Sequence, residues 1–253
     1  MFNVSYKLTS IFTNIANALR NKLEITESIK ADDIPEIISE CFADDIIGKI
    51  LDKTIKYLPS VYTKSCTTIG NSTFRNCTSL ISINFPVCTT IGSHAFQACK
   101  SLITANFSAC TTIGPSAFQS CTSLTTANFP ACTTIGDYAF WLCSSLANIN
   151  FPTCTTIGTS AFANCYSLTN INFPDCTTIG TSAFANCFYL TTLFLGNPTI
   201  CLLSNSNAFY RTPIAGYNTH TSINGSIFVP MSLLSAYQSA TNWIYFSSRI
   251  FVL

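Results

Sequence analysis

The stretch CTTIGTSAFANCYSLTNINFPD (154–175) is followed at once by a second CTTIGTSAFANC (176–187). The CTTIG motif occurs six times at a constant step of 22 positions, and a second cysteine follows each first cysteine 11 positions later. Self-similarity at a short fixed period is the signature of a solenoid, so it predicts repeated coils. The motifs begin at Cys66, Cys88, Cys110, Cys132, Cys154 and Cys176, and the second cysteines are Cys77, Cys99, Cys121, Cys143, Cys165 and Cys187.

Each copy contains the signals for two strands and a compact turn. In SLTNINFP (167–174), Ile171 and Phe173 alternate with asparagines, which predicts a half-buried strand ended by proline. CTTIG predicts a second short strand ended by Gly180, whose conformational freedom permits a sharp turn. TSAFANC (181–187) predicts one or two helical turns opened by a hydroxyl cap. Each copy is therefore one coil.

One coil is too small to bury its own apolar side, so the coils are expected to stack, with parallel strands about 4.8 Å apart. Identical residues then form ladders. The predicted inward ladders are Ile69, Ile91, Ile113, Ile135, Ile157 and Ile179; Phe74, Phe96, Phe118, Phe140, Phe162 and Phe184; and Leu80, Leu102, Leu124, Leu146, Leu168 and Leu190.

The 14 cysteines admit three interpretations. Free cysteine is a small, strongly buried hydrophobe, so a thiol can fill a narrow corner of every coil. Disulfides between coils are within reach, although parallel side chains on stacked strands hold their Cβ atoms wider apart than a disulfide prefers. A metal site needs converging ligands, which the spacing and two histidines do not supply. We favour buried thiols.

Composition excludes several partners. The net charge is +1 and 9% of residues are charged, so no field attracts nucleic acid or an anionic membrane. No apolar run approaches the roughly 20 residues that cross a bilayer. The stretch from Met1 to Arg20 lacks the features of a signal peptide, so synthesis in a reducing cytosol is expected.

The repeat resembles the BspA-like class of bacterial leucine-rich repeats, whose units read IGxxAFxxCxSLTxIxFP. The resemblance covers roughly residues 47–253 and implies a right-handed solenoid with a parallel strand ladder, short helical turns and a binding role. SIFVPMSLLSAYQSATNWIYFSSRI (226–250) resembles the closing element of this family, a strand and helix that cover the last coil. Between the regular repeats and this closing element, the 22-residue period is lost over residues 194–224, which predicts a degenerate seventh coil with an insertion.

Residues 1–45 differ in kind. Leu8, Ile11, Ile15 and Leu19 recur at helical spacing, and a second helix is expected from Asp33. The segment resembles a leading segment of phage and prophage structural proteins of Gram-positive bacteria, which implies attachment to other virion proteins or self-association into a homo-oligomer. A helical cap on the first coil is the alternative. The predicted domains are 1–45, 46–193 (six regular repeats) and 194–253.

Catalysis is not expected, because no nucleophile lies beside a base and no paired acids share a site. His94 occupies a variable surface position, and Asp137 and Asp175 fall in different columns of the repeat. No phosphate loop or metal motif is present, so no cofactor is predicted.

Aromatic departures from the consensus mark a candidate ligand-binding surface. Aromatic rings beside Ser, Thr and Asn side chains suit a neutral glycan, since rings stack on sugars while hydroxyls and amides hold sugar oxygens. The alternative is that the later aromatic residues pack under the insertion and cap. The outward strand asparagines either bond one another or present a polar surface. The predicted binding residues are Tyr138, Trp141, Tyr166, Phe188 and Tyr189.

The sequence thus predicts a non-enzymatic recognition or adhesion module of a virion, associated with a phage tail or related particle and binding a host surface glycan or protein. A structural spacer or assembly protein without a ligand is the first alternative. An intracellular scaffold for a partner protein is the second.

Overall fold

The structure is a computed structural model that describes residues 66–216 and 224–253. The chain divides into two compact units, Met1–Phe42 and Ala43–Leu253, and every described residue belongs to the second. The predicted N-terminal helices and Cys41 lie outside the described residues.

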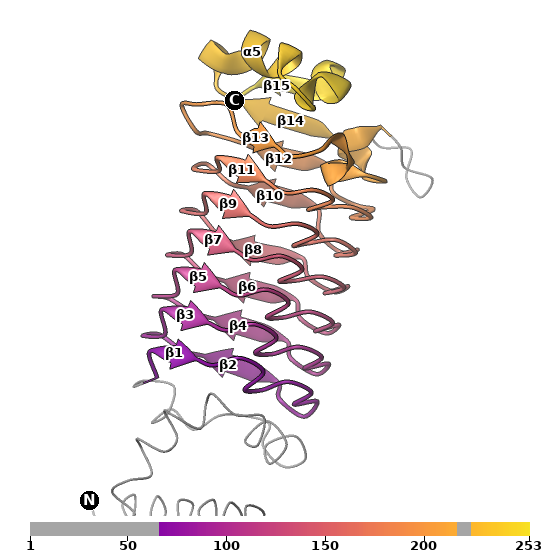
Figure 1. Cartoon of the computed structure of the whole chain (residues 1–253). Helices are drawn as coiled ribbons and strands as arrows, with labels where there is room; N and C mark the ends of the chain where they lie inside the picture. The colour runs from indigo at the N-terminus through magenta and orange to yellow at the C-terminus, as the bar shows by residue number, and fades with distance from the viewer. Residues whose placement is uncertain (1–65, 217–223) are drawn as a thin grey trace, which may run out of the picture. The chain divides into compact units, whose positions relative to one another are not determined.

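The described residues form stacked coils, each with a first and a second strand (Figure 1). We number the coils 1 (66–87), 2 (88–109), 3 (110–131), 4 (132–153), 5 (154–175), 6 (176–200) and 7 (201–216 and 224–229), followed by a closing segment (230–253). The first strands are β1 (Thr68–Ile69), β3 (Thr90–Ile91), β5 (Thr112–Ile113), β7 (Thr134–Ile135), β9 (Thr156–Ile157), β11 (Thr178–Ile179) and β13 (Leu202–Leu203). The second strands are β2 (Ser82–Asn84), β4 (Thr104–Asn106), β6 (Thr126–Asn128), β8 (Asn148–Asn150), β10 (Asn170–Asn172), β12 (Thr192–Phe194) and β14 (Ser226–Val229), and β15 (Ile250–Val252) extends this series.

All strand pairs are parallel and in the register of the sequence repeat. Thr134 pairs with Thr156 and Ile135 with Ile157, so identical residues of the repeat lie side by side. The first strands form one sheet in the order β1-β3-β5-β7-β9-β11-β13. The predicted solenoid with a parallel strand ladder is therefore confirmed.

The second strands form two sheets, because the ladder is interrupted once. The orders are β2-β4-β6-β8 and β10-β12-β14-β15. Between neighbouring coils the N–H of Phe129 donates to the O of Asn150 at 2.9 Å, whereas no backbone hydrogen bond joins β8 to β10 among the described residues. The rings of Phe151 and Phe173 are 6.3 Å apart at this point, compared with 5.2 Å for Phe129 and Phe151.

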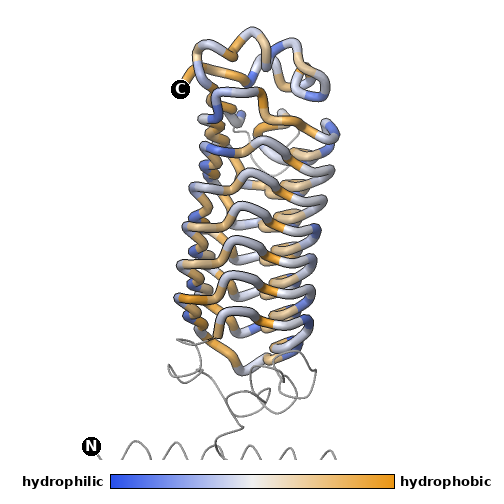
Figure 2. Tube along the Cα trace, turned by 60° about the vertical axis from the view of Figure 1, so that its left-hand side comes forward, coloured by the Kyte–Doolittle hydropathy of each residue, from blue (hydrophilic) through white to orange (hydrophobic). Residues whose placement is uncertain are grey.

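Two phenylalanine columns form the core, and Figure 2 shows the apolar positions recurring at the same place in successive coils. Phe118 and Phe140 stack at 5.1 Å with an interplanar angle of 1°. Phe140 also contacts Phe151 of the second column edge to face at 5.8 Å. Face-to-face stacking within a column and edge contacts between columns lock successive coils together. The predicted inward Ile, Phe and Leu ladders are all buried.

The glycine of CTTIG is required for a different reason from the one predicted. Gly180 has no positive φ. A Cβ on Gly136 would lie 2.8 Å from the carbonyl carbon of Gly114 and from the oxygen of Ile113 in the preceding coil. Close stacking of coils, rather than turn freedom, therefore demands glycine.

The segment after this glycine forms consecutive turns instead of the expected helical turns. Two non-glycine residues in each of coils 1–6 are left-handed, as in Ser160 (φ 52°) and Asn164 (φ 63°). Their amides donate to the next coil: Ser160 N to Thr181 O and Asn164 N to Ala185 O, both at 2.9 Å. A helix would keep those bonds within the coil. Bonds between coils offset the backbone strain. We call positions 6–12 of each coil the turn arc.

The described cysteines fill two columns, as the thiol interpretation predicted. Twelve are buried and Cys66 is partly exposed. From coil 2 onward, each second-column thiol donates to a carbonyl of the previous coil, as Cys143 Sγ does to Phe118 O at 3.1 Å. Burial raises the pKa of Cys110 and Cys132 to about 12. These thiols therefore stay neutral and serve as packing groups with weak donors.

Coil 7 and the closing segment depart from the regular repeat. Coil 7 contains the 3₁₀ helices η1 (Ser206–Phe209) and η2 (Pro213–Ala215). The closing segment comprises the 3₁₀ helix η3 (Met231–Leu233), α5 (Leu234–Ser239), the 3₁₀ helix η4 (Trp243–Arg249) and β15.

The closing segment covers coil 7 and is bonded to it. Buried Tyr237 accepts the N–H of Cys201 on its Oη at 2.8 Å, and Trp243 Nε1 donates to the O of Cys201 at 2.7 Å. The closing segment is thus fixed to coil 7 through both backbone groups of one residue.

Candidate binding surface

A stacked aromatic column crosses coils 5–7. Tyr166 and Phe188 occupy the position after the second cysteine in coils 5 and 6, and their rings stack at 5.2 Å with a 3° angle. The guanidinium of Arg211 in coil 7 lies 5.9 Å from the centre of the Phe188 ring, a cation–π contact. We call Tyr166, Phe188 and Arg211 the ring column. Arg211 belongs to the irregular region after residue 193, so Phe188 contacts that region and stays half-exposed.

The other predicted binding residues lie at separate positions. Tyr138 is 43% exposed and occupies a left-handed position of the coil 4 turn arc (φ 58°). Trp141 lies three positions further along the same arc and is half-buried. Tyr189 is 50% exposed and follows Phe188 in coil 6. The five residues therefore do not form one cluster, and their role in binding stays a prediction.

Trp141 belongs to a column whose next members are small. The carbonyls of Trp141, Ala163, Ala185 and Tyr210 each accept an arc amide from the coil before, so these residues share one position in coils 4–7. Ala163 and Ala185 are buried, while Tyr210 is 54% exposed. Trp141 and Tyr210 therefore flank two positions without large side chains.

Sequence reasoning missed a further aromatic column on the strand face. In the outward asparagine column, Asn172 pairs with Phe194, which pairs with Phe228, which pairs with Phe251. The rings of Phe194 and Phe228 stack at 5.0 Å, and Phe251 is 47% exposed. Phe194 could have been predicted to lie on this face, since it replaces asparagine at a fixed repeat position.

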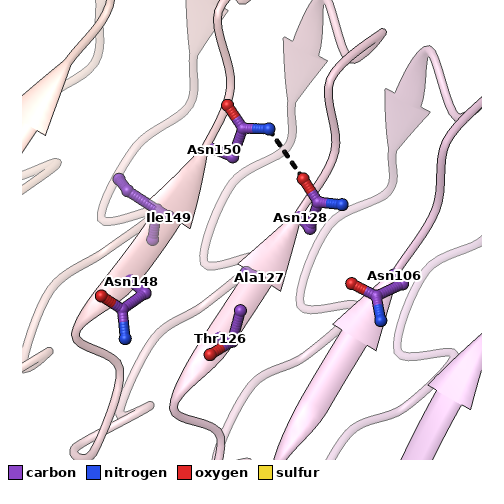
Figure 3. A pocket seen from close by; sticks show the side chains of 7 residues that line it. All are labelled: Asn106, Thr126, Ala127, Asn128, Asn148, Ile149 and Asn150. Atoms are coloured by element: carbon purple, nitrogen blue, oxygen red, sulfur yellow. Dashed lines mark hydrogen bonds between the residues drawn. The ribbon is translucent and has the colours of Figure 1, made fainter.

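The outward face of the second strands contains a shallow depression of about 250 Å³ (Figure 3). Its rim is polar, and Asn150 Nδ2 donates to Asn128 Oδ1 at 2.7 Å, one bond of the kind expected along an asparagine ladder. Its floor includes Ala127 and half-buried Ile149, whose counterparts in the other second strands are buried. The depression is lined by Asn106, Thr126, Ala127, Asn128, Asn148, Ile149 and Asn150.

Ionisable side chains do not converge on a reactive site. Asp137 accepts the N–H of Thr159 on its Oδ1 at 2.7 Å, so it ties coil 4 to coil 5. The described residues contain no group of three or more His, Cys, Asp or Glu side chains that could hold a metal ion. Across residues 66–216 and 224–253, no helix is long and apolar enough to span a bilayer.

The repeat, the parallel ladders and the phenylalanine columns agree with a family model. The description "BspA type Leucine rich repeat region (6 copies)" matches residues 50–165 and 111–235. The chain is a BspA-type leucine-rich repeat protein. No protein of curated function matches its sequence.

Solved leucine-rich repeat proteins resemble this BspA-type chain over part of their length. A protein from Eubacterium ventriosum is 25% identical with a TM-score of 0.54, over 68% of this chain and 47% of that one. One from T. pallidum is 30% identical with a TM-score of 0.40, over 46% and 53%. One from Bacteroides ovatus is 18% identical with a TM-score of 0.44, over 74% and 57%. The chain thus spans about half the length of these three structures.

Membership of the BspA-type family bears on activity. Proteins of this family and fold are typically non-enzymatic binding scaffolds. The fold alone names no ligand, so the surface side chains of this repeat module must define any ligand that it binds.

Proposed function

We propose that this protein is a non-enzymatic recognition module, carried on a phage tail or related particle by residues 1–45, that binds a glycan or protein on a host cell surface. The ring column of Tyr166, Phe188 and Arg211 is the observation that supports this proposal most directly. Both rings are half-exposed. Aromatic rings at the surface of a solenoid cost solubility and add little to a core that already contains two phenylalanine columns.

The surroundings of the ring column favour a neutral ligand. Between residues 110 and 200 the only charged side chains are Asp137 and Asp175, and the one charge within the ring column, Arg211, lies against Phe188 at the end away from Tyr166. Hydroxyl and amide groups cover the rest of this surface, and such groups bind sugar oxygens or peptide groups without requiring charge.

The test uses the full chain, fluorescently labelled, on intact Gram-positive cells and on their isolated wall glycans. We expect saturable binding by the natural chain. A Trp141→Ala/Tyr166→Ala variant with the same melting temperature should bind at least tenfold more weakly. Absence of binding by the natural chain across a broad panel would favour the structural spacer.

Attachment to a particle needs a separate measurement. Antibodies against the solenoid should label the tails of intact particles from the producing strain. Protein found only free in the host cytosol would contradict the virion location and favour an intracellular scaffold.

A further inference from the structure

We infer that one neutral pyranose ring binds against the open face of Tyr166, above Ser144, as the next layer of the ring column. This inference rests on the proposed function, because it names the ligand class and the position at the same surface. The ring column has a covered side and an open side, and only the open side can receive a ligand.

The covered side is closed by the protein itself. One face of Tyr166 lies on Phe188 at 5.2 Å, and Arg211 of the next coil lies 5.9 Å from the centre of Phe188. Rings stacked face to face leave only their edges to a ligand. The one remaining ring face of the column is therefore the face of Tyr166 that points toward coil 4.

The open side meets a small residue. The column positions in coils 4, 3 and 2 are Ser144, Thr122 and Lys100, so no ring continues the stack. Ser144 Oγ donates to Thr122 O at 3.3 Å, so its hydroxyl turns toward coil 3 and away from Tyr166. A third ring at the spacing of the first two would lie directly above Ser144.

The tyrosine is held in place before any ligand arrives. Ser167, the next residue, donates to Ser144 O from its N at 3.2 Å and from its Oγ at 2.9 Å. This double contact holds the backbone beside Tyr166, and the stack on Phe188 holds its ring. Little ordering entropy remains to be lost on binding, which favours affinity for a single small ring.

The chemistry of the position fits a neutral pyranose. The apolar C–H face of a pyranose stacks on an aromatic ring, and its edge carries hydroxyls. The exposed Ser167 beside Tyr166 keeps the lone pairs of its hydroxyl oxygen for a sugar hydroxyl. In coils 3–6 the only charged side chains are Asp137 and Asp175, and Arg211 of coil 7 lies against Phe188 on the covered side of the column.

The decisive variant fills the position with a ring of the protein's own. Ser144→Tyr should extend the stack, because the same column already accepts two aromatic rings, and it should keep the melting temperature. Lys100→Tyr is the matched control, since it adds the same ring to the same column three coils away from Tyr166.

The probes are methyl β-glucopyranoside, methyl β-galactopyranoside and methyl N-acetyl-β-glucosaminide, followed by NMR of a full chain with labelled tyrosine rings. We expect at least one to shift the Tyr166 resonance in the natural chain and in Lys100→Tyr, with at least tenfold weaker binding in Ser144→Tyr. Pyranoside binding that Ser144→Tyr leaves unchanged would overturn the position, with the strand-face depression as the next site to test.

The two proposals can fail separately. Cell binding without any pyranoside response would overturn the sugar inference while the recognition function stands. Loss of all binding, to cells and to pyranosides, would remove both.

Discussion

The two strand ladders are made by the same coils, yet one is continuous and the other is not. The seven first strands pair without interruption, whereas the second strands separate between β8 and β10. The first strands carry the same Thr-Ile pair in coils 1–6, while the inward residue of the second strands is isoleucine in coils 1, 4 and 5, alanine in coils 2 and 3 and leucine in coil 6. The interruption lies at the first place where two isoleucines, Ile149 and Ile171, meet at this inward position. Ile149 is half-buried there. Two facing isoleucines do not by themselves open the ladder, because Ile227 and Ile250 face each other in the paired strands β14 and β15.

The comparison shows that two neighbouring coils can stay joined although one of their strand pairs lacks hydrogen bonds. At the interface of coils 4 and 5 the first strands remain paired and the turn arc donates three backbone bonds, while β8 and β10 share none. An interruption on one side is tolerated because the other two sides hold the coils together.

The largest expected effect is a loss of stability on truncating a core phenylalanine, which should differ between the closely stacked core and the interface of coils 4 and 5. Phe140→Ala should lower the free energy of unfolding by about 3–5 kcal/mol, because Phe140 stacks on neighbours at 5.1 and 5.2 Å. Phe173→Ala should cost less, since its three ring contacts are at 6.2–6.3 Å and tilted or loosely stacked. Equal losses in urea unfolding would show that the interruption does not loosen the core.

Alkaline pH should weaken the first-strand side. The pKa of Cys110 and Cys132 rises from 9.0 to about 12 on burial, so above pH 9 the unfolded chain loses protons that the folded chain retains. The contribution of these thiols to stability is therefore complete below pH 9 and falls as the pH rises toward 12.

A variant without these two thiols tests the pH dependence. From pH 8 to pH 10 the natural chain should lose about 2–3 kcal/mol more stability than Cys110→Ala/Cys132→Ala. Each thiol contributes about 1.4 kcal/mol per pH unit, and only the unit above the unfolded pKa of 9.0 counts in this interval. Urea unfolding at each pH measures the slopes. Parallel slopes for the two proteins would contradict the buried-thiol account.

Close stacking of the coils is tested at glycine. Gly136→Ala should destabilise the chain by about 1–3 kcal/mol, because its Cβ would lie 2.8 Å from backbone atoms of coil 3. Gly196→Ala is the matched control, since its nearest neighbours would be 3.4 Å away and the chain should accept it with little loss. Similar melting temperatures for both variants would mean that the coils shift apart at low cost.

The smallest effect concerns the interruption itself. Amide hydrogen exchange should be faster at Phe151 and Thr169 than at their counterparts Phe129 and Thr191, which donate to neighbouring coils at 2.9 and 2.8 Å. Exchange reports local opening directly and requires no substitution. Equal protection at all four amides would show that β8 and β10 pair in solution.

The ladders could be predicted from the sequence because each column repeats one residue at one spacing. The interruption could not, since β8 and β10 have the same Asn-Ile-Asn sequence and differ only in their neighbours. The turn arc was also misjudged. Ser and Ala favour helical turns locally, and the left-handed residues become favourable only when a second coil accepts their amides.

The candidate surface was only partly predictable. Tyr166 and Phe188 share a repeat position, so their proximity followed from the period alone. Arg211 and Tyr210 could not be placed from the sequence. The stacked pair Phe184 and Phe209 shows that coil 6 is longer than the regular repeat, so the 22-residue period does not predict which residues of coil 7 continue each column. Phe251 was hidden in the same way, since β15 follows the helical part of the closing segment.

The turn arc has an electrical consequence. Three of its amides donate toward the following coil at each of the first five interfaces, as from Phe74 to Ala95 O and from Phe140 to Ala161 O. Peptide dipoles that share a direction add, as they do in a helix. The arc therefore acts as a macrodipole along the solenoid, with its positive pole toward coil 7 and its negative pole toward coil 1. This polarity is opposite to that of an α-helix, whose positive pole is at its N-terminus. Few charged side chains lie on coils 2–6 to offset it.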